Sequence, residues 1–280
     1  MNNFLSQHPD IFMAKKELHY FGSDLRVKER ISKSDYLAHF KDATSSKIAG
    51  EASVWYLFSE KAANEIKSFC PQARIIIMLR DPVEVLHSLH SQHLIDGNED
   101  EADFKTALQL DEQRKLGLSR PNSLEFYELP SYKETVSYAV QVERYLTNFG
   151  SENVHVVLHD DLRNDVTKVV DDTITFLGVP PCPHIRYQVV NPRKVLKSLT
   201  LHRLMKNPST RLKKFIRAIL PFKVMRHILM KLLFKINIGK KSSLKRDKDF
   251  DRELRSVLSS DIQQLSTLIN RDLSNWMNSE

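Results

Sequence analysis

The sequence predicts an α/β fold of three layers, with helices on both faces of a mostly parallel β-sheet and further helices at the C-terminus. Two uninterrupted apolar runs, Ile75–Leu79 and Val154–Leu158, have the length and the β-branched content of buried parallel strands. Helical patterns alternate with these runs along the chain. Two of the expected helices stop at Gly150 and Gly178, as helices commonly do at glycine.

The segment Arg74–Ser88 predicts a buried strand that turns directly into a helix. Arg80 falls at the carboxyl end of the strand, the edge at which open α/β sheets bind ligands. Asp81 and Pro82 suit the cap and the first position of the helix. Its apolar stripe consists of Val83, Leu86, Leu89 and Leu94. Ser88 lies about two helical turns after Arg80, so a guanidinium and a hydroxyl can reach one phosphate.

This segment resembles the element with which sulfotransferases bind the 3′-phosphate of 3′-phosphoadenosine 5′-phosphosulfate (PAPS), an Arg-Asp-Pro-Val-Glu run with a Ser eight residues beyond the Arg. The resemblance implies that Arg80 and Ser88 bind PAPS as a co-substrate. The alternative is an arginine that pairs with Asp81 or Glu84 and a serine that faces solvent.

A second stretch, Ser6–Phe21, resembles the segment after the phosphosulfate loop of carbohydrate sulfotransferases, including their Lys-Glu-x-His-aromatic-Phe pattern. In the heparan sulfate branch the Glu is the proposed general base, and the His lies beside the acceptor. By position these catalytic residues are Glu17 and His19. The alternative is a solvated Lys-Lys-Glu run followed by a half-buried histidine among aromatic residues.

A third stretch, Lys47–Tyr56, resembles the family's Gly-Glu-x-Ser/Thr-Pro-x-Tyr strand and turn. It differs from the heparan sulfate enzymes at Ala52, where they carry Lys, and at Val54, where they carry Pro. The substrate specificity of those enzymes therefore does not carry over. Glu51 is either a second polar contact in the cleft or a carboxylate at the end of a strand, and the sequence favours neither.

The family binds the 5′-phosphosulfate in a glycine-containing loop with a lysine, and the printed sequence has no such loop. Met1–Pro9 resembles the second half of the helix that follows the loop. We therefore expect that the chain begins inside the fold, or that it is a degenerate protein that does not bind the donor normally. A strand followed by such a loop upstream of Met1 would favour the enzyme.

Between the expected helices, 96–131 is a polar stretch, which in the family covers the acceptor cleft. It is expected to be a mobile helical lid or an ordinary surface insertion. Further along, 149–162 resembles the strand that ends in Tyr-Glu-Asp-Leu in sulfotransferases. Here the strand ends in His159, for which a structural hydrogen bond is favoured over a role as base.

Composition describes a globular chain, with 41% hydrophobic and 28% charged residues. Cys70 and Cys182 form neither a disulfide framework nor a metal motif, so a reducing compartment and no metal are expected. The sequence contains no apolar run long enough to span a membrane, and no signal peptide follows Met1. The expected location is cytoplasmic, with a peripheral membrane contact through the basic tail described next.

The basicity of the chain is local. Residues 206–248 hold fourteen Lys or Arg and one acid, Asp247, a net charge of +13, whereas the whole chain carries +7. Aliphatic residues alternate with the cations at helical spacing, which predicts two cationic amphipathic helices broken at Pro221. Such a segment suits an anionic membrane surface or an anionic glycan, with nucleic acid the least favoured partner. The alternative is a subdomain whose apolar stripe packs on the core.

The last segment, 249–277, is expected to be one long helix packed on the fold, and its ending, 268–276, resembles the close of bacterial carbohydrate-type sulfotransferases. The predicted domains are a sulfotransferase core at 1–205, a basic helical segment at 206–248 and a terminal helix at 249–280. The resemblance implies the sulfotransferase fold, which is related to P-loop nucleotide kinases.

The implied function is transfer of a sulfuryl group from PAPS to a hydroxyl of a carbohydrate or of a lipid-linked carbohydrate. The alternative is a truncated or degenerate protein of the same fold, without catalysis, that binds anions or a membrane surface.

Overall fold

The computed structural model describes residues 1–15, 17–27, 30–118, 131–187, 195–206, 209–211, 218–219, 222–239 and 246–278. These form two compact units. The first comprises 1–82, 134–190 and 253–280, and the second comprises 83–133 and 191–252.

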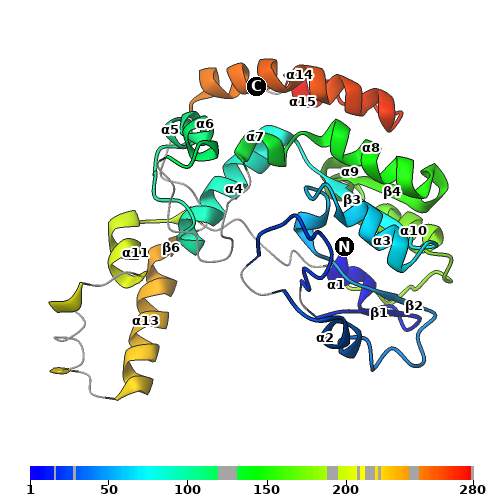
Figure 1. The fold of residues 1–280 in the computed structure, drawn as a ribbon, viewed down its shortest axis with the longest axis horizontal. Helices are drawn as coiled ribbons and strands as arrows, with labels where there is room; N and C mark the ends of the chain where they lie inside the picture. The colour runs from blue at the N-terminus through cyan, green and yellow to red at the C-terminus, as the bar shows by residue number, and fades with distance from the viewer. Residues whose placement is uncertain are drawn as a thin grey trace. The chain divides into compact units, whose positions relative to one another are not determined.

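Two pairs of parallel strands form the centre of the first unit (Figure 1). β1 (Ile11–Met13) pairs with β2 (Ile48–Gly50), and β3 (Ile75–Leu79) pairs with β4 (Val154–Leu158). The parallel pairing and both of the strands expected from the apolar runs are confirmed.

Helices surround these strands. The helices of the first unit are α1 (Asn2–Leu5), α2 (Lys33–Ala38), α3 (Ala62–Phe69), α8 (Tyr138–Phe149), α9 (His159–Asn164), α10 (Val166–Phe176) and α15 (Ser274–Asn278), with 3₁₀ turns at Val54–Tyr56 and Ser151–Asn153. α8 and α10 end next to Gly150 and shortly before Gly178, as the sequence predicts. Gly150 and Gly178 after them adopt positive φ angles of 77° and 71°, which glycine allows without strain.

The faces of the β3–β4 pair are covered unequally. Ile76 packs in a cluster with α10, and the ring of His155 stacks on Phe176 of α10. Ile77 and Leu79 point to the other face and are buried there, since side chains alternate along a strand. Met78, however, is 41% exposed, so the expectation that the strand is buried on both faces along its whole length is wrong.

The C-terminal region is not one helix. α14 (Lys248–Leu268) ends before Asn270, whose φ of 51° turns the chain, and α15 follows after a short turn. Phe250, Leu254, Leu258, Ile262 and Leu265 of α14 are buried, whereas Val257 is exposed. Asp261 of α14 accepts hydrogen bonds from the backbone N–H groups of Tyr138 and Ala139 at 2.9 and 3.2 Å, and so caps α8.

The second unit is mostly helical. It contains α4 (Pro82–Asp96) from Val83 onward, α5 (Phe104–Gln109), α6 (Asp111–Lys115), α11 (Leu199–Lys206) and α13 (Lys223–Asn237), while α7 (Tyr132–Thr135) begins in it. A short antiparallel pair joins β5 (Val195–Leu196) to β6 (Ile238–Gly239). Of the two basic helices predicted, the second is α13, while most of the first and Pro221 lie outside the described residues. None of the described helices is long and apolar enough to span a membrane.

Candidate functional site

Glu17 and His19 lie in a loop that follows β1. The Nε2 atom of His19 is 3.3 Å from the Oε2 atom of Glu17. The side chain of Glu17 is 44% exposed, whereas that of His19 is 16% exposed, so the carboxylate is open to solvent and the imidazole beside it is mostly buried. The structure therefore brings together the two residues that the sequence assigned to catalysis.

Two hydroxyl groups hold this loop by its backbone. Ser53 Oγ accepts hydrogen bonds from the N–H groups of Leu18 and His19, at 3.0 and 3.2 Å. Tyr56 Oη accepts from the next two, Tyr20 and Phe21, at 2.9 and 3.2 Å. Four consecutive N–H groups are thus satisfied by two side chains more than thirty residues away along the chain.

Both hydroxyls in turn donate to one carboxylate, that of Glu51. Ser53 Oγ donates to Oε2 at 2.8 Å, and Tyr56 Oη donates to Oε1 at 3.1 Å. Because their hydrogens point at Glu51, their lone pairs are directed at the loop. We call Glu51, Ser53 and Tyr56 the loop clamp.

Burial raises the pKa of Glu51 above its ordinary value, and the hydrogen bonds from the clamp hydroxyls oppose this rise. Burial and the Glu51 charge together raise the pKa of Tyr56, so its hydroxyl keeps its proton. The sequence left Glu51 undecided. The structure makes it a carboxylate that organises the loop of Glu17 and His19.

The loop's carbonyl groups have a separate partner. The guanidinium of Arg30 donates to the carbonyl oxygens of Tyr20, Phe21 and Gly22 at 2.9, 3.2 and 2.6 Å. His19 has a positive φ of 47°, which is uncommon for a residue with a side chain. Its Nδ1 is buried and has no hydrogen-bond partner among the described residues. An uncommon backbone conformation and a buried ring nitrogen without a partner, in a loop fixed by hydrogen bonds, are typical of a functional position.

Arg80 and Ser88 lie in different units. Arg80 is half-buried and directly follows β3, as the sequence predicts. Ser88 is half-buried on α4. Of the neighbouring acids, Asp81 pairs with Arg255 at 2.9 Å and Glu84 pairs with Arg246. Each of these carboxylates thus has a cation other than Arg80 beside it.

Two sequence motifs that are far apart meet in the first unit. Asp160 accepts a hydrogen bond from the Nε1–H group of Trp276 at 2.8 Å, and Asp161 pairs with Arg271 at 2.9 Å. The acids that follow β4 are therefore structural partners of the C-terminal motif. His159 begins α9 beside them.

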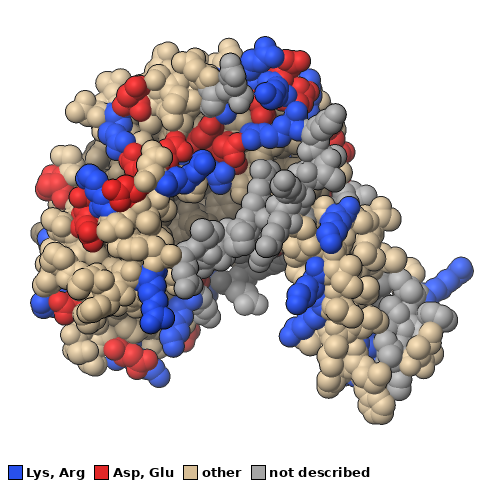
Figure 2. Space-filling view, turned by 180° about the vertical axis from the view of Figure 1, so that it is seen from behind, with Lys and Arg blue, Asp and Glu red and all other residues tan. Residues whose placement is uncertain are grey.

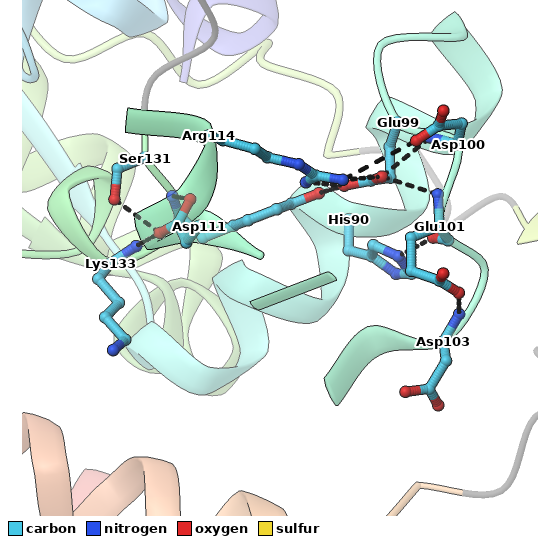
Figure 3. A network of polar contacts seen from close by, with 10 residues as sticks. His90, Glu99, Asp100, Glu101, Asp103, Asp111, Arg114, Ser131 and Lys133 are labelled. Carbon is cyan, nitrogen blue, oxygen red and sulfur yellow. Dashed lines mark hydrogen bonds and ion pairs between the residues drawn. The ribbon is translucent and has the colours of Figure 1, made fainter. Parts of the chain in front are cut away.

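The predicted lid contains a buried polar network, shown in Figure 3. The carboxylate of Glu99 receives two hydrogen bonds from the guanidinium of Arg114, at 2.6 and 2.7 Å, and one from the hydroxyl of Tyr132 at 2.9 Å. Asp111 accepts from Ser131 Oγ at 2.7 Å. The described residues of this stretch are thus joined by buried polar contacts, while residues 119–130 lie outside the described residues.

The network shifts the pKa values of its members. Burial raises the pKa of Glu99, but the hydrogen bonds and charge of Arg114, together with hydrogen bonds from the Glu101 N–H group and the Tyr132 hydroxyl, lower it by more, so the net pKa is lowered. Burial lowers the pKa of His93 to about 4, so this histidine is neutral at physiological pH. Across the described ranges, no group of three His, Cys, Asp or Glu residues is arranged to hold a metal ion.

The described structure has parallel strands, a clamped carboxylate loop after β1 and an arginine directly after β3, at the strand ends where open α/β sheets bind ligands. Comparison with known families identifies the family. The sulfotransferase domain model matches residues 58–237, and the chain belongs to this family. The match includes Arg80 and Ser88, whereas Glu17, His19 and Glu51 precede it.

Individual relatives agree with this assignment. The chain is 30% identical over 141 residues to the mouse bifunctional heparan sulfate N-deacetylase/N-sulfotransferase 4, covering 49% of this chain and 15% of the relative. It is 25% identical over 177 residues to the mouse heparan sulfate glucosamine 3-O-sulfotransferase 5, covering 63% and 49%. The chain thus spans less than half the length of these two relatives.

Among solved structures, a sulfotransferase from Alicyclobacillus acidocaldarius superposes with a TM-score of 0.68 at 25% identity, covering 99% of this chain and 92% of the other. The predicted fold class is confirmed.

Proposed function

We propose that this chain transfers the sulfuryl group of PAPS to a hydroxyl of a carbohydrate or of a lipid-linked carbohydrate. The observation that carries the proposal is the clamped loop, which presents an exposed Glu17 carboxylate 3.3 Å from His19 in a chain of the sulfotransferase family. The heparan sulfate enzymes among its relatives support a carbohydrate acceptor.

In the proposed reaction Glu17 takes the proton of the acceptor hydroxyl. The acceptor oxygen forms a bond to sulfur as the bond between sulfur and the bridging phosphate oxygen breaks. His19, held at Glu17, orients the carboxylate and the acceptor. The loop clamp fixes both side chains, and such positioning is a main source of rate in group transfer.

Arg80 and Ser88 are proposed to bind the 3′-phosphate of the donor. A guanidinium at the carboxyl end of a parallel strand suits a phosphate, since it offers two parallel N–H donors and a fixed charge. PAPS supplies the activated sulfuryl group. No metal is proposed for the reaction.

Donor binding is tested by titration calorimetry with adenosine 3′,5′-bisphosphate. Arg80→Ala should weaken binding by roughly tenfold to a hundredfold, the value of a charge-assisted phosphate contact, and Ser88→Ala by less. Arg163→Ala and Ser260→Ala change the same residue types at exposed helical positions and serve as matched controls. Equal affinity in all four variants would remove the phosphate role of Arg80 and Ser88.

Catalysis is tested with radiolabelled PAPS and heparan sulfate from which either the O-sulfates or the N-sulfates have been removed. Glu17→Gln should leave donor binding intact and lower turnover by about a hundredfold or more. Glu60→Gln, at an exposed position, is its control. Unchanged turnover in Glu17→Gln would disprove the role of base, and transfer to amino groups only would disprove the hydroxyl acceptor.

The second candidate is a non-catalytic protein of the same fold that binds anions or a membrane surface. It is favoured by the basic segment 206–248, with its net charge of +13. Binding of the bisphosphate without any transfer would support it. For either function we propose a cytoplasmic location with peripheral contact between this segment and an anionic membrane.

A further inference from the structure

The helix α13 has two apolar faces. Its inner face carries Leu229, Leu233 and Phe234, which are half-buried, and the ring of Phe234 lies 6.0 Å from that of His202 on α11. α11 and α13 lie side by side (Figure 1). The inner face is therefore accounted for by packing within the second unit.

The outer face is apolar as well. Val224, Ile228, Leu232 and Ile236 follow one another at intervals of four residues and therefore share one face of the helix. They are 70%, 60%, 53% and 55% exposed. The alternative in which the apolar stripe of this segment packs on the core therefore does not account for these four residues of α13. We call these four residues the outer stripe.

Cations border the outer stripe, and acids are absent from its neighbourhood in sequence. Lys231 and Lys235 are exposed on the same helix, one residue before Leu232 and Ile236. The sequence from 173 to 246 contains neither Asp nor Glu. In Figure 2 the lobe formed by α11 and α13 is mostly tan, with Lys and Arg beside the tan surface.

The helix is also fixed in place. The side chain of Asn237 at its C-terminal end accepts a hydrogen bond from Ser198 N and donates one to Ser198 O, both at 2.9 Å. Lys197 N donates to the carbonyl of Asn237 at 2.8 Å. The outer stripe is therefore presented by a preformed helix about 22 Å long.

We infer that the outer stripe of α13 inserts into the surface of an anionic lipid bilayer, with Lys231 and Lys235 at the level of the lipid phosphates. A bilayer offers both an apolar layer for the aliphatic side chains and negative charge for the lysines. Nucleic acid or an anionic glycan offers only the charge. A second copy of the chain would bring lysines against lysines with no nearby acid from this segment.

This inference deepens the membrane contact proposed for 206–248 and does not depend on the transfer reaction. Electrostatic attraction alone disappears at high salt, where the Debye length is short. Insertion of aliphatic side chains leaves binding that resists salt, because burial of apolar area is not screened. The two contributions are therefore separable by experiment.

The test is co-sedimentation of the full chain with vesicles of phosphatidylcholine containing about a third phosphatidylserine, at low salt and at about 0.5 M salt. Ile228→Ser with Leu232→Ser should lower partitioning by at least about tenfold at both salt concentrations. Lys231→Gln with Lys235→Gln should lower it by about tenfold at low salt and little at high salt.

The control is Val140→Ser with Val257→Ser, which removes two equally exposed valines from helices of the other unit. It should bind as the parent chain does, and the circular dichroism of all variants should match. The inference is overturned if the serine variant of the outer stripe still binds like the parent, if the control loses as much, or if the parent does not bind. A lipid-free dimer that the outer-stripe variant abolishes would assign the face to self-association and also overturn it.

Discussion

Replacing Tyr56 by Phe removes a single oxygen atom from the centre of the loop clamp. That hydroxyl accepts hydrogen bonds from the N–H groups of Tyr20 and Phe21 and donates one to Glu51. The ring keeps its volume, so no cavity forms. Two backbone donors lose their partner at once, and the half-buried carboxylate of Glu51 loses one of its hydrogen bonds.

The expected loss of stability follows from these three bonds. A neutral hydrogen bond contributes about 1 kcal/mol net, one to a charged group somewhat more, and a buried group left unpaired adds to the loss. Allowing for water that reaches the half-buried N–H of Tyr20, we expect Tyr56→Phe to lower the free energy of unfolding by about 2 to 3 kcal/mol. Urea unfolding followed by circular dichroism measures it.

Tyr145→Phe is the matched control. It makes the same chemical change at an equally buried ring, but the hydroxyl of Tyr145 donates only to the carbonyl of Tyr56, at 2.7 Å. We expect a loss of about 1 kcal/mol there. If Tyr56→Phe costs no more than Tyr145→Phe, the clamp does not hold the loop as described.

The loss should also depend on pH. Burial holds the pKa of Glu51 in the folded chain above its unfolded value. The parent chain and Tyr56→Phe therefore both lose stability from Glu51 as pH rises through that raised pKa. Tyr56→Phe removes a hydrogen-bond donor that favours the charged form of Glu51, so the pKa of Glu51 is higher in this variant than in the parent chain. The difference between the two proteins should therefore be largest near neutral pH and shrink as acid protonates Glu51. A difference that grows on acidification would refute this reasoning.

Three further expectations concern other buried polar groups. Arg114→Met should destabilise the chain by about 3 to 5 kcal/mol in urea unfolding, because it leaves the buried Glu99 carboxylate without its cation; a loss below about 1 kcal/mol would contradict a buried pair. His93→Leu should flatten the pH dependence of stability between about 4 and 6.5, since a histidine whose pKa is lowered by burial loses stability as pH falls through this window; an unchanged pH profile would show that His93 is not buried as a neutral ring. Trp276→Phe should cost about 2 kcal/mol or more in urea unfolding, because it removes the hydrogen bond to Asp160 and leaves a cavity at a side chain that is only 1% exposed; a double-mutant cycle with Asp160→Ala isolates the hydrogen bond, and a coupling energy near zero would contradict it.

The sequence predicted those parts of the fold that depend on local pattern. The strand at Ile75–Leu79 and the helix that ends at Gly150 follow from apolar runs and helix-stop residues that are close together in the chain. The exposure of Met78 was missed because burial depends on which helix covers a face of the sheet. The break at Asn270 was missed although asparagine tolerates a positive φ, because the apolar spacing on either side of it continues as in one helix.

Much of the candidate site depends on contacts between distant residues, and single-sequence reasoning does not supply these. The roles of Asp160 and Arg255 are set by Trp276 and Asp81, which lie far away along the chain. The outer stripe of α13 is a similar case. Periodicity identified an amphipathic helix, but only the packing of α11 decides which apolar face stays exposed.

The turn at 51–56 shows where sequence did carry a usable signal. Of the family pattern in this turn, the chain keeps Glu51, Ser53 and Tyr56, and these three make the clamp. It replaces the family's Pro by Val54, which is exposed and takes no part in the clamp's hydrogen bonds, so the turn forms without proline. It also replaces the heparan sulfate enzymes' Lys by Ala52. Since the parts that hold Glu17 and His19 are retained while a cation beside them is lost, we expect the same chemistry on an acceptor that carries less negative charge than heparan sulfate.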